Sequence, residues 1–259
     1  MALFTDADVV TLDDLLQFET SLVQVASTHG INVDTKINLA VSGISDRVLL
    51  WLLRMGASDP QWMRRRVVGL STVVVTPPVS KWIGFDALSR FYAEAYNVQL
   101  NTRFQGKWME YQQLATEASQ MAFDSGVGIV YTPLPKPAMP LVSIQNGSGP
   151  AQSMYVQTSW VDIRGDEGAL SRVNGSILPD QSSIAVGMTE GLLGAPTGAI
   201  GWNVYLSTTA ADLTKQNDQP LTIGATWQMP SSGLIQGVFP VGGQQPDYQI
   251  QLSRLLQRG

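Results

Sequence analysis

Residues 133–140 read Pro-Leu-Pro-Lys-Pro-Ala-Met-Pro, and the character of the chain changes at this stretch. Before it lie long helical patterns rich in aromatic residues, and after it come short alternating runs separated by Gly, Pro and Ser. Because proline lacks a backbone donor and cannot continue a helix, such a run separates structural elements. The stretch therefore predicts a hinge between two differently built modules.

The modules predict an α+β protein, with an N-terminal α-helical bundle followed by a C-terminal all-β sandwich. The expected boundaries are a helical domain at residues 1–132, a hinge at 133–141, a sandwich at 142–242 and a C-terminal arm at 243–259. At 259 residues with 44% apolar content, the chain is long enough to bury two separate cores.

Three helical patterns precede the hinge. Asp14 stands three residues after Thr11, which approximates a capping box, and Gly30 is expected to end that first helix. A second pattern runs from about Asp34 to Leu53 and is expected to end at Gly56. The third is the clearest, and whether residues 101–106 divide it stays open. Its apolar positions follow the helical period: Phe85, Leu88, Tyr92, Ala95 and Tyr96, then Trp108, Tyr111, Ala115, Ala118 and Ala122.

Beyond the hinge, strand composition recurs at residues 154–163, 182–188, 201–207 and 221–228. Asn146-Gly147 and Asn174-Gly175 are expected to form turns between strands. The final stretch alternates at Tyr248, Ile250 and Leu252 and then carries Leu255 and Leu256. It is read either as a last strand or as an arm that docks on a neighbouring subunit.

The bulk composition excludes several classes of protein. Cysteine is absent, which removes disulfides, thiolate nucleophiles and most structural zinc sites. No basic residue precedes Lys36, so a secretory signal is not expected, and the longest apolar run, Val48 to Leu53, is too short to cross a bilayer. We expect synthesis in the cytoplasm and no contact with a membrane.

The charge balance disfavours binding to a phosphate backbone. The formal net charge is −5, and neither side of residue 140 has a basic excess. Only 14% of residues are charged, while uncharged polar residues are abundant. Because such groups are cheaper to desolvate than ions, the surface is expected to face other protein subunits as well as water.

No catalytic constellation is recognisable, and we predict that the protein is not an enzyme. The single histidine, His29, stands at a predicted helix end, where the helix dipole accounts for it, and no Gly-x-Ser-x-Gly elbow is present to partner it. A hydrolase that uses His29 with a carboxylate is an alternative hypothesis. The adjacent carboxylates at residues 13–14 and 166–167 do not face each other across a cleft, as glycoside hydrolysis requires.

Cofactor and metal sites are also not expected. Asp162, Asp166 and Glu167 offer the carboxylates of a calcium-binding loop, but they lack the spacing of an EF-hand. Gly126-Val127-Gly128 lacks the third glycine of a dinucleotide fingerprint.

Two clusters have competing interpretations. Arg64, Arg65 and Arg66 are either a solvated surface, a contact with another subunit or, as the minority reading, a contact with DNA. Three tryptophans lie in predicted strands, where large aromatic residues usually fill the core. The alternative is a platform that stacks on sugars, formed by Trp160, Trp202 and Trp227.

Two segments resemble known families. Residues 96–108 (Tyr-Asn-Val-Gln-Leu-Asn-Thr-Arg-Phe-Gln-Gly-Lys-Trp), followed by a helix, Gly126-Val127-Gly128 and the Pro-rich stretch, resemble a family of tailed-phage virion proteins. Residues 201–207 (Gly-Trp-Asn-Val-Tyr-Leu-Ser) look like the third strand of a fibronectin type III or immunoglobulin-like domain. The resemblance spans the chain from about residue 80 onward.

The order of the strands departs from that pattern. In a fibronectin type III domain, the run at residues 155–171 would belong to the last two strands, yet here it precedes residues 201–207. The sandwich is therefore expected to be rearranged, truncated or completed by the C-terminal tail.

The resemblance implies a structural protein of the virion neck, the head–tail connector adaptor, with an immunoglobulin-like module attached to a helical one. Such adaptors form a ring, typically dodecameric, between the portal protein and the tail or tail-terminator proteins, and genomic DNA passes through the lumen without sequence-specific binding. A tail terminator and a carbohydrate- or receptor-binding module of the tail or baseplate remain alternatives. The candidate interface residues are Arg64, Arg65, Arg66, Arg103, Lys107, Trp108, Tyr248, Ile250, Leu252, Leu255 and Leu256.

Overall fold

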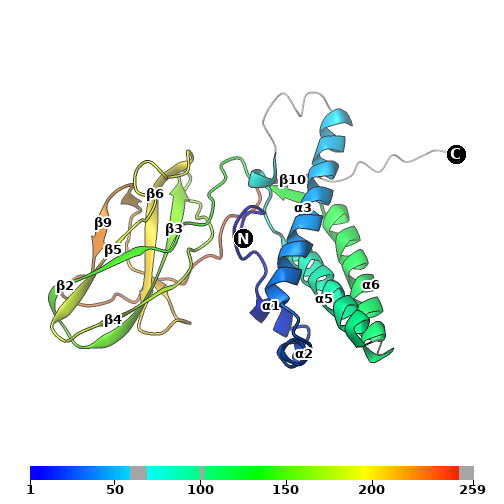
Figure 1. Cartoon of the computed structure of the whole chain (residues 1–259). Coiled ribbons are helices and arrows are strands. Elements are labelled where there is room, and N and C mark those ends of the chain that lie inside the picture. Colours follow the sequence, from blue (N-terminus) through cyan, green and yellow to red (C-terminus); the bar gives the residue numbers. More distant parts are fainter. Residues whose placement is uncertain (59–68, 100–101, 251–259) are drawn as a thin grey trace. The chain divides into compact units, whose positions relative to one another are not determined.

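The protein consists of helices over residues 12–125 followed by β-sheets, which confirms the predicted α+β class (Figure 1). The structure is a computed structural model that describes residues 1–58, 69–99 and 102–250. It contains two compact units. We call Ala7–Ile129, together with the chain from Pro246 onward, the helical unit, and Met1–Asp6 with Val130–Gln245 the β unit.

These units differ from the predicted domains at both ends of the chain. The first six residues belong to the β unit rather than to the helical domain, and strand β10 belongs to the helical unit rather than to a separate arm. The chain therefore passes between the units at residues 6–7, 129–130 and 245–246. Neither unit is formed by one continuous stretch of sequence.

The predicted hinge at residues 133–141 lies instead within the β unit. The Leu134 side chain is buried in that unit's core. Three of the four non-proline residues between the prolines donate their backbone N–H to a side chain: Leu134 to Gln244 Oε1, Lys136 to Asp6 Oδ1 and Ala138 to Glu190 Oε1. Because these bonds and the buried Leu134 side chain tie the Pro-rich segment to the rest of the β unit, the segment is a fixed part of that unit.

The helical unit contains five α-helices among the described residues, one 3₁₀ turn and a small sheet. Two strands, β1 and β10, pair in antiparallel fashion, and Val73 bridges to Ile129 on the other side of β1. The elements are α1 (Leu12–Leu16), α2 (Leu22–His29), α3 (Val33–Ser58), η1 (Leu70–Thr72), α5 (Pro77–Gln99), α6 (Thr102–Ser125), β1 (Val127–Ile129) and β10 (Tyr248–Ile250).

The local signals at the start of the chain were mostly informative. Thr11 and Asp14 form the expected capping box, and Gly30 ends α2 in the left-handed conformation. The first predicted helix is nevertheless divided into α1 and α2. The second helix also continues to Ser58, past the predicted stop at Gly56.

The third pattern forms two helices, α5 and α6, which pack along each other (Figure 1). Its apolar positions form the core between them, where the rings of Tyr92 and Tyr111 stack with centroids 5.7 Å apart. Gly126, with φ of 96°, ends α6.

The β unit is built from two antiparallel sheets. One has the order β2-β5-β9, and the other has the order β4-β3-β6-β7 with β8 also paired to β6. The strands are β2 (Leu141–Gly149), β3 (Gln152–Asp162), β4 (Asn174–Leu178), β5 (Ser182–Gly187), β6 (Ala199–Ser207), β7 (Thr214–Lys215), β8 (Leu221–Thr222) and β9 (Thr226–Gln228).

The sheets form a sandwich, because inward side chains from both of them share one buried core. Met154, Val156 and Trp202 from one sheet contact a cluster that also holds Ile184 and Val186 from the other. Both predicted turns at Asn-Gly pairs were wrong. Asn146-Gly147 lies in β2, where the register with β5 shifts, and Asn174-Gly175 begins β4.

The strand order explains the departure seen in the sequence. In an immunoglobulin-type sandwich, strand B lies between A and E, and the opposite sheet runs in the order C′-C-F-G. If β6 takes the third-strand place C, then β7-β6-β3-β4 reproduces C′-C-F-G and β2-β5-β9 reproduces A-B-E. The β3–β4 hairpin thus takes the places of strands F and G, which come last in an immunoglobulin-type chain. Here these strands directly follow β2, before the strands that take the places B, C and E. Of the three alternatives, rearrangement is the one that the pairing order matches.

Candidate functional site

The clearest candidate surface lies on α3, because this helix carries apolar side chains on both of its faces. Ile44, Val48 and Leu52 point into the helical unit and are buried. On the opposite side, Leu50 and Leu53 are 54% and 52% exposed. A helix that is apolar all round is normally buried all round. We call the outward group of Leu39, Leu49, Leu50 and Leu53 the α3 leucine face.

Charged residues next to this face have partners inside the helical unit. The Arg47 guanidinium lies over the Trp82 ring, 5.8 Å from its centroid. Lys36 forms an ion pair with Glu94 of α5. The outward side of the second half of α3 therefore combines these leucines with two exposed charged residues, Asp46 and Arg54, and its large exposed aliphatic side chains favour contact with another protein surface.

Residues 103–108, which hold three of the interface candidates, form the start of α6 and contact their own unit. Lys107 Nζ lies 3.1 Å from Glu19 Oε2, and the Arg103 guanidinium lies over the Phe104 ring. Trp108 is half-buried and stacks on Tyr96 with centroids 6.1 Å apart. These three interface candidates therefore lie together, and the contacts of Lys107 and Trp108 help to hold α6 against the rest of the unit.

Glu19 is the electrostatic centre of this region. It is buried, and its carboxylate accepts hydrogen bonds from the hydroxyls of Ser21 at 2.7 Å and Tyr111 at 3.1 Å. Burial alone would raise the pKa of Glu19, but the hydrogen bonds from Ser21, Lys107 and Tyr111 outweigh it and lower the pKa. Burial, and secondly the Glu19 charge, raise the pKa of Tyr92 to about 12.

The tail candidates divide into two groups. Tyr248 and Ile250 form β10, where Ile250 is buried opposite Val127, so this part of the tail is a last strand. The other candidates, Leu252, Leu255 and Leu256, lie outside the described residues, as do Arg64, Arg65 and Arg66.

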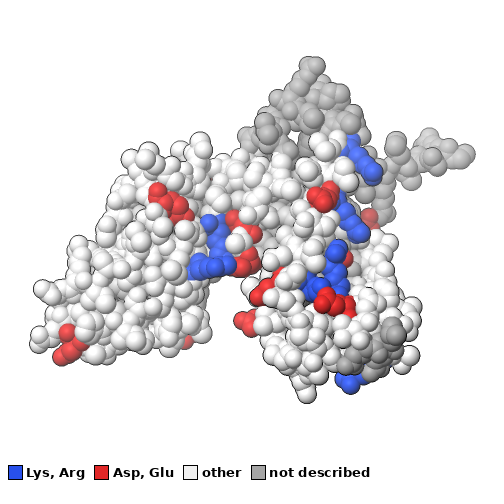
Figure 2. All heavy atoms as spheres, in the orientation of Figure 1, with Lys and Arg blue, Asp and Glu red and all other residues white. Residues whose placement is uncertain are grey.

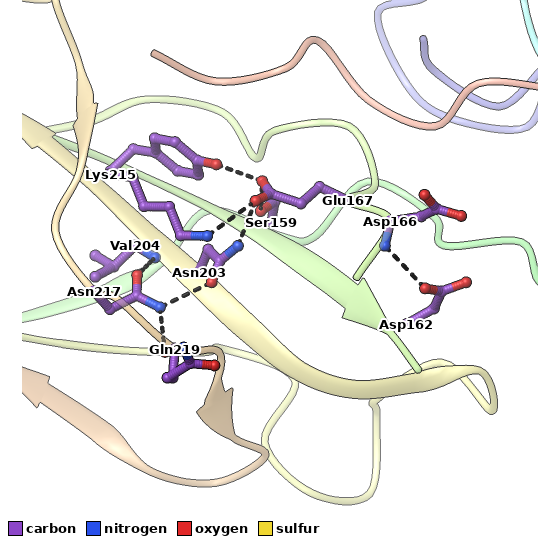
Figure 3. A network of polar contacts seen from close by, with 10 residues as sticks. Ser159, Asp162, Asp166, Glu167, Asn203, Val204, Lys215, Asn217 and Gln219 are labelled. Carbon is purple, nitrogen blue, oxygen red and sulfur yellow. Dashed lines mark hydrogen bonds and ion pairs between the residues drawn. The ribbon is translucent and has the colours of Figure 1, made fainter. Parts of the chain in front are cut away.

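A network of polar side chains covers the outer face of the β3–β6 sheet (Figure 3). The Glu167 carboxylate accepts hydrogen bonds from Ser159 at 3.1 Å, from Asn203 at 2.6 Å and from the Tyr205 hydroxyl. Lys215 Nζ lies 3.3 Å from the same carboxylate. Burial, together with the hydrogen bond to Glu167, raises the pKa of Tyr205 above its usual range.

This network has the character of a structural one. The side chains of Glu167 and Lys215 are only 12% and 20% exposed. Asn217 extends the network, because its amide donates to Asn203 and its oxygen accepts from the backbone N–H of Val204. A carboxylate surrounded by four donors is held in place on the sheet and has little capacity left for an external group.

Asp162 performs a similar local task in the turn that follows β3. Its Oδ1 accepts hydrogen bonds from the backbone N–H groups of Arg164 and Asp166, which closes the turn at Gly165. The bond from Asp166 is drawn in Figure 3. Among the described residues, no group of three or more acidic or histidine side chains could hold a metal ion.

The tryptophans of the sandwich are buried, which confirms the core interpretation. Trp160 is 1% exposed, Trp202 is fully buried and Trp227 is 7% exposed. None of the three can stack on a sugar without unfolding the sandwich. The aromatic platform that motivated the carbohydrate-binding alternative is therefore wrong.

Two hollows lie on the part of the chain that the structure describes, one in each unit. One of about 190 Å³ lies beside His29, whose ring meets Phe104 edge-on at 5.3 Å. The other, of about 630 Å³, opens where the ends of β2 and β9 meet, and uncharged residues line it, among them Gln145, Asn146, Gln152 and Gln228. Neither hollow brings together an acid, a base and a nucleophile.

Comparison of the chain with protein-family models, with curated proteins and with solved structures gave no match. Within the described ranges, no helix combines the length and apolar character that a membrane crossing requires. The α3 leucine face was missed at the level of sequence. Its signal was present in the apolar run from Val48 to Leu53, which provides more apolar positions than one helix face can hold.

Proposed function

We propose that this chain is a non-enzymatic structural protein of a tailed-phage virion, the head–tail connector adaptor, which assembles as a ring between portal and tail. The observation that carries the proposal is the α3 leucine face, because large aliphatic side chains in the middle of an exposed helix surface favour burial against another subunit. A ring forms when two different surfaces of each copy bind its two neighbours and the rotation from copy to copy completes a circle.

Two further features support the proposal. The acidic chain has no basic excess, so a lumen formed by its copies would let DNA slide without holding its phosphates. The polar side chains that could otherwise be assigned to chemistry, Glu167 and Asp162, are bound within the β unit. The dodecameric state and the portal and tail neighbours follow from the sequence resemblance and form part of the proposal.

The test uses the purified full chain, alone and mixed with the portal protein, in light scattering and negative-stain imaging. We expect rings that form alone or on the portal. The double variant Leu50→Lys/Leu53→Lys should abolish assembly and keep the helical circular-dichroism signal. Met109→Lys, at a 59% exposed position on α6, is the matched control and should assemble normally. A chain that stays monomeric with portal contradicts the proposal, and binding to tail tubes alone favours a tail terminator.

A further inference from the structure

One side of the β unit consists of two unprotected strand edges. β2 pairs only with β5, and β4 pairs only with β3, so each leaves one edge unpaired in its sheet. The two edges lie close together, because Asn174 of β4 donates a hydrogen bond to the carbonyl of Pro140, just before β2. Four aliphatic side chains are exposed on this side, which we call the β4 edge: Leu141, Ile144, Val173 and Ile177.

Ile144 shows that the core is incomplete at this edge. It lies opposite Ile184, which is buried in the shared core, so both side chains point to the inner face of the sheet. Ile184 is 1% exposed, whereas Ile144 is 50% exposed. Ile177, on β4, is exposed by 78%. An apolar side chain that faces inward yet stays half in water favours a cover from another chain.

The far edge of the other sheet carries a second apolar row. Beyond β7, the segment after β9 runs alongside the sheet, and Lys215 donates its backbone N–H to the carbonyl of Val238 at 2.9 Å. We call its exposed side chains the β7 edge, which consists of Ile235, Val238, Phe239 and Val241. Phe239 is exposed by 65%.

The β7 edge is held in place by specific contacts. Gln216 both accepts a hydrogen bond from the Ile235 N–H and donates one to its carbonyl, like a strand partner. Gly237 lies so close to Lys215 that a Cβ there would meet the Lys215 carbonyl oxygen at 1.8 Å. The apolar row is therefore presented to solvent by a fixed backbone rather than by a loose loop.

The β4 edge and the β7 edge both lack the charged residues that normally keep an exposed strand from pairing with another chain. Natural edge strands carry lysine, other charges or proline to prevent pairing with further chains. Here no acidic or basic residue occurs at 137–161, at 173–179 or at 219–246, and the protection is limited to prolines such as Pro140, Pro179 and Pro240. In Figure 2, most of the visible face of the β unit, on the left, carries neither sign.

We propose that the β unit associates head to tail with a second copy of this chain, the β4 edge of one copy covering the β7 edge of the next. The edges lie at opposite ends of the sheet order β4-β3-β6-β7. A contact between two different patches on opposite sides is heterologous and is the kind that continues into a closed ring. This inference rests on the proposed ring assembly and names the surfaces that form it in the β unit.

Site-directed cross-linking tests the pairing directly, because the chain contains no cysteine of its own. Ile177→Cys and Phe239→Cys are prepared as separate full-length proteins and treated with a short bismaleimide, each alone and as an equal mixture. We expect roughly tenfold more covalent dimer in the mixture, because the interface holds the two thiols at a high effective concentration. Leu193→Cys, at a fully exposed position in the same unit, is the matched control for random collision.

The outcomes are distinct. Cross-linking of Ile177→Cys to itself indicates a symmetric contact and overturns the proposal. Rings that form without any cross-link between the two sites overturn it while leaving the connector function intact, and a monomer under all conditions contradicts both. A chain that carries both Ile177→Cys and Phe239→Cys provides one more outcome. If its two thiols cross-link only within one copy, the β4 edge and the β7 edge of the same copy contact each other, and the proposal is overturned.

A charge exchange provides the second measurement. Ile177→Lys and Phe239→Glu should each lower self-association in sedimentation velocity by at least about tenfold, because an ion would be buried at an apolar contact. In the equal mixture, the β4 edge of a Phe239→Glu copy and the β7 edge of an Ile177→Lys copy are both unaltered, and the opposite pairing brings the lysine against the glutamate. Association should therefore recover. Failure of the mixture to recover, with both variants folded, overturns the head-to-tail pairing.

Discussion

Trp160 of β3 lies directly opposite Trp202 of β6, and both indole side chains are buried inside the sandwich. Trp202 Nε1 also donates a hydrogen bond to the Thr222 carbonyl at 3.2 Å, which ties β6 to β8. The pair therefore belongs to the core that joins the two sheets. Its contribution is to stability, and that assignment can be measured.

The Trp202→Ala substitution should destabilise the β unit by about 3 to 5 kcal/mol, the usual cost of removing a large buried aromatic side chain. Guanidinium denaturation followed by tryptophan fluorescence measures the change. Leu193→Ala, at a fully exposed position, should alter the unfolding free energy by less than about 0.5 kcal/mol. A Trp202→Ala protein as stable as the parent would show that the indole is not part of the core.

The Tyr205→Phe substitution should destabilise the β unit by about 1.5 to 3 kcal/mol, because it removes a hydrogen bond to a charged carboxylate. The pKa of Tyr205 is raised, so its contribution is fully present below about pH 10, the usual tyrosine value, and is lost as pH rises through the folded-state pKa. Asp166→Asn, whose side chain is 52% exposed, is the control. An equal loss in both variants would contradict a specific role for the Glu167 network.

The Glu19→Gln substitution should destabilise the helical unit at neutral pH by about 1.5 to 3 kcal/mol, the range for hydrogen bonds to a charged group. Because the pKa of Glu19 is lowered on folding, the stabilisation is present above about pH 4.3, the usual glutamate value, and disappears as pH falls through the folded-state pKa. Urea denaturation of both proteins from pH 7 to pH 3 measures the difference. A difference independent of pH would show that Glu19 acts by packing alone.

The helical unit was the part of the fold that the sequence predicted best. Aromatic and alanine residues recur at the helical period over α5 and α6, and local signals such as the Thr11–Asp14 box mark the ends. The break between α1 and α2 was missed because its cause is distant in sequence. Glu19 lies in that break, and its carboxylate is fixed by Tyr111 and Lys107 of α6.

The β unit was harder to predict for a physical reason. β2 is almost fully exposed and shows no alternation of burial, so it lacks the signal of a half-buried strand. Gly175 was taken for a turn residue, whereas it lies against the Tyr155 ring in the strand pair, at a distance where a Cβ would touch the ring. The partners of Glu167 come from β3, β6 and β7, so they are far apart in the sequence, and no short motif predicts the network.

The last prediction concerns β10, the strand through which the end of the chain completes the helical unit. Ile250 is buried opposite Val127, and Asp247 donates its N–H to the Ile129 carbonyl at 2.9 Å. Gly128 lies so close to Pro246 that a Cβ would meet the proline ring at 2.9 Å. Deleting the chain from Pro246 onward should therefore expose β1 and lower the stability of the helical unit.

We expect a loss of about 2 to 5 kcal/mol for that deletion, comparable with truncating one large buried aliphatic side chain to alanine. Ile250→Ala should reproduce most of the loss. A deletion that begins after Ile250 keeps the β1–β10 pairing and is the matched control. Thermal unfolding followed at 222 nm, where helices dominate the signal, measures all three proteins. If the two deletions had equal melting temperatures, β10 would contribute nothing to the unit, and its pairing with β1 would be incidental to the fold.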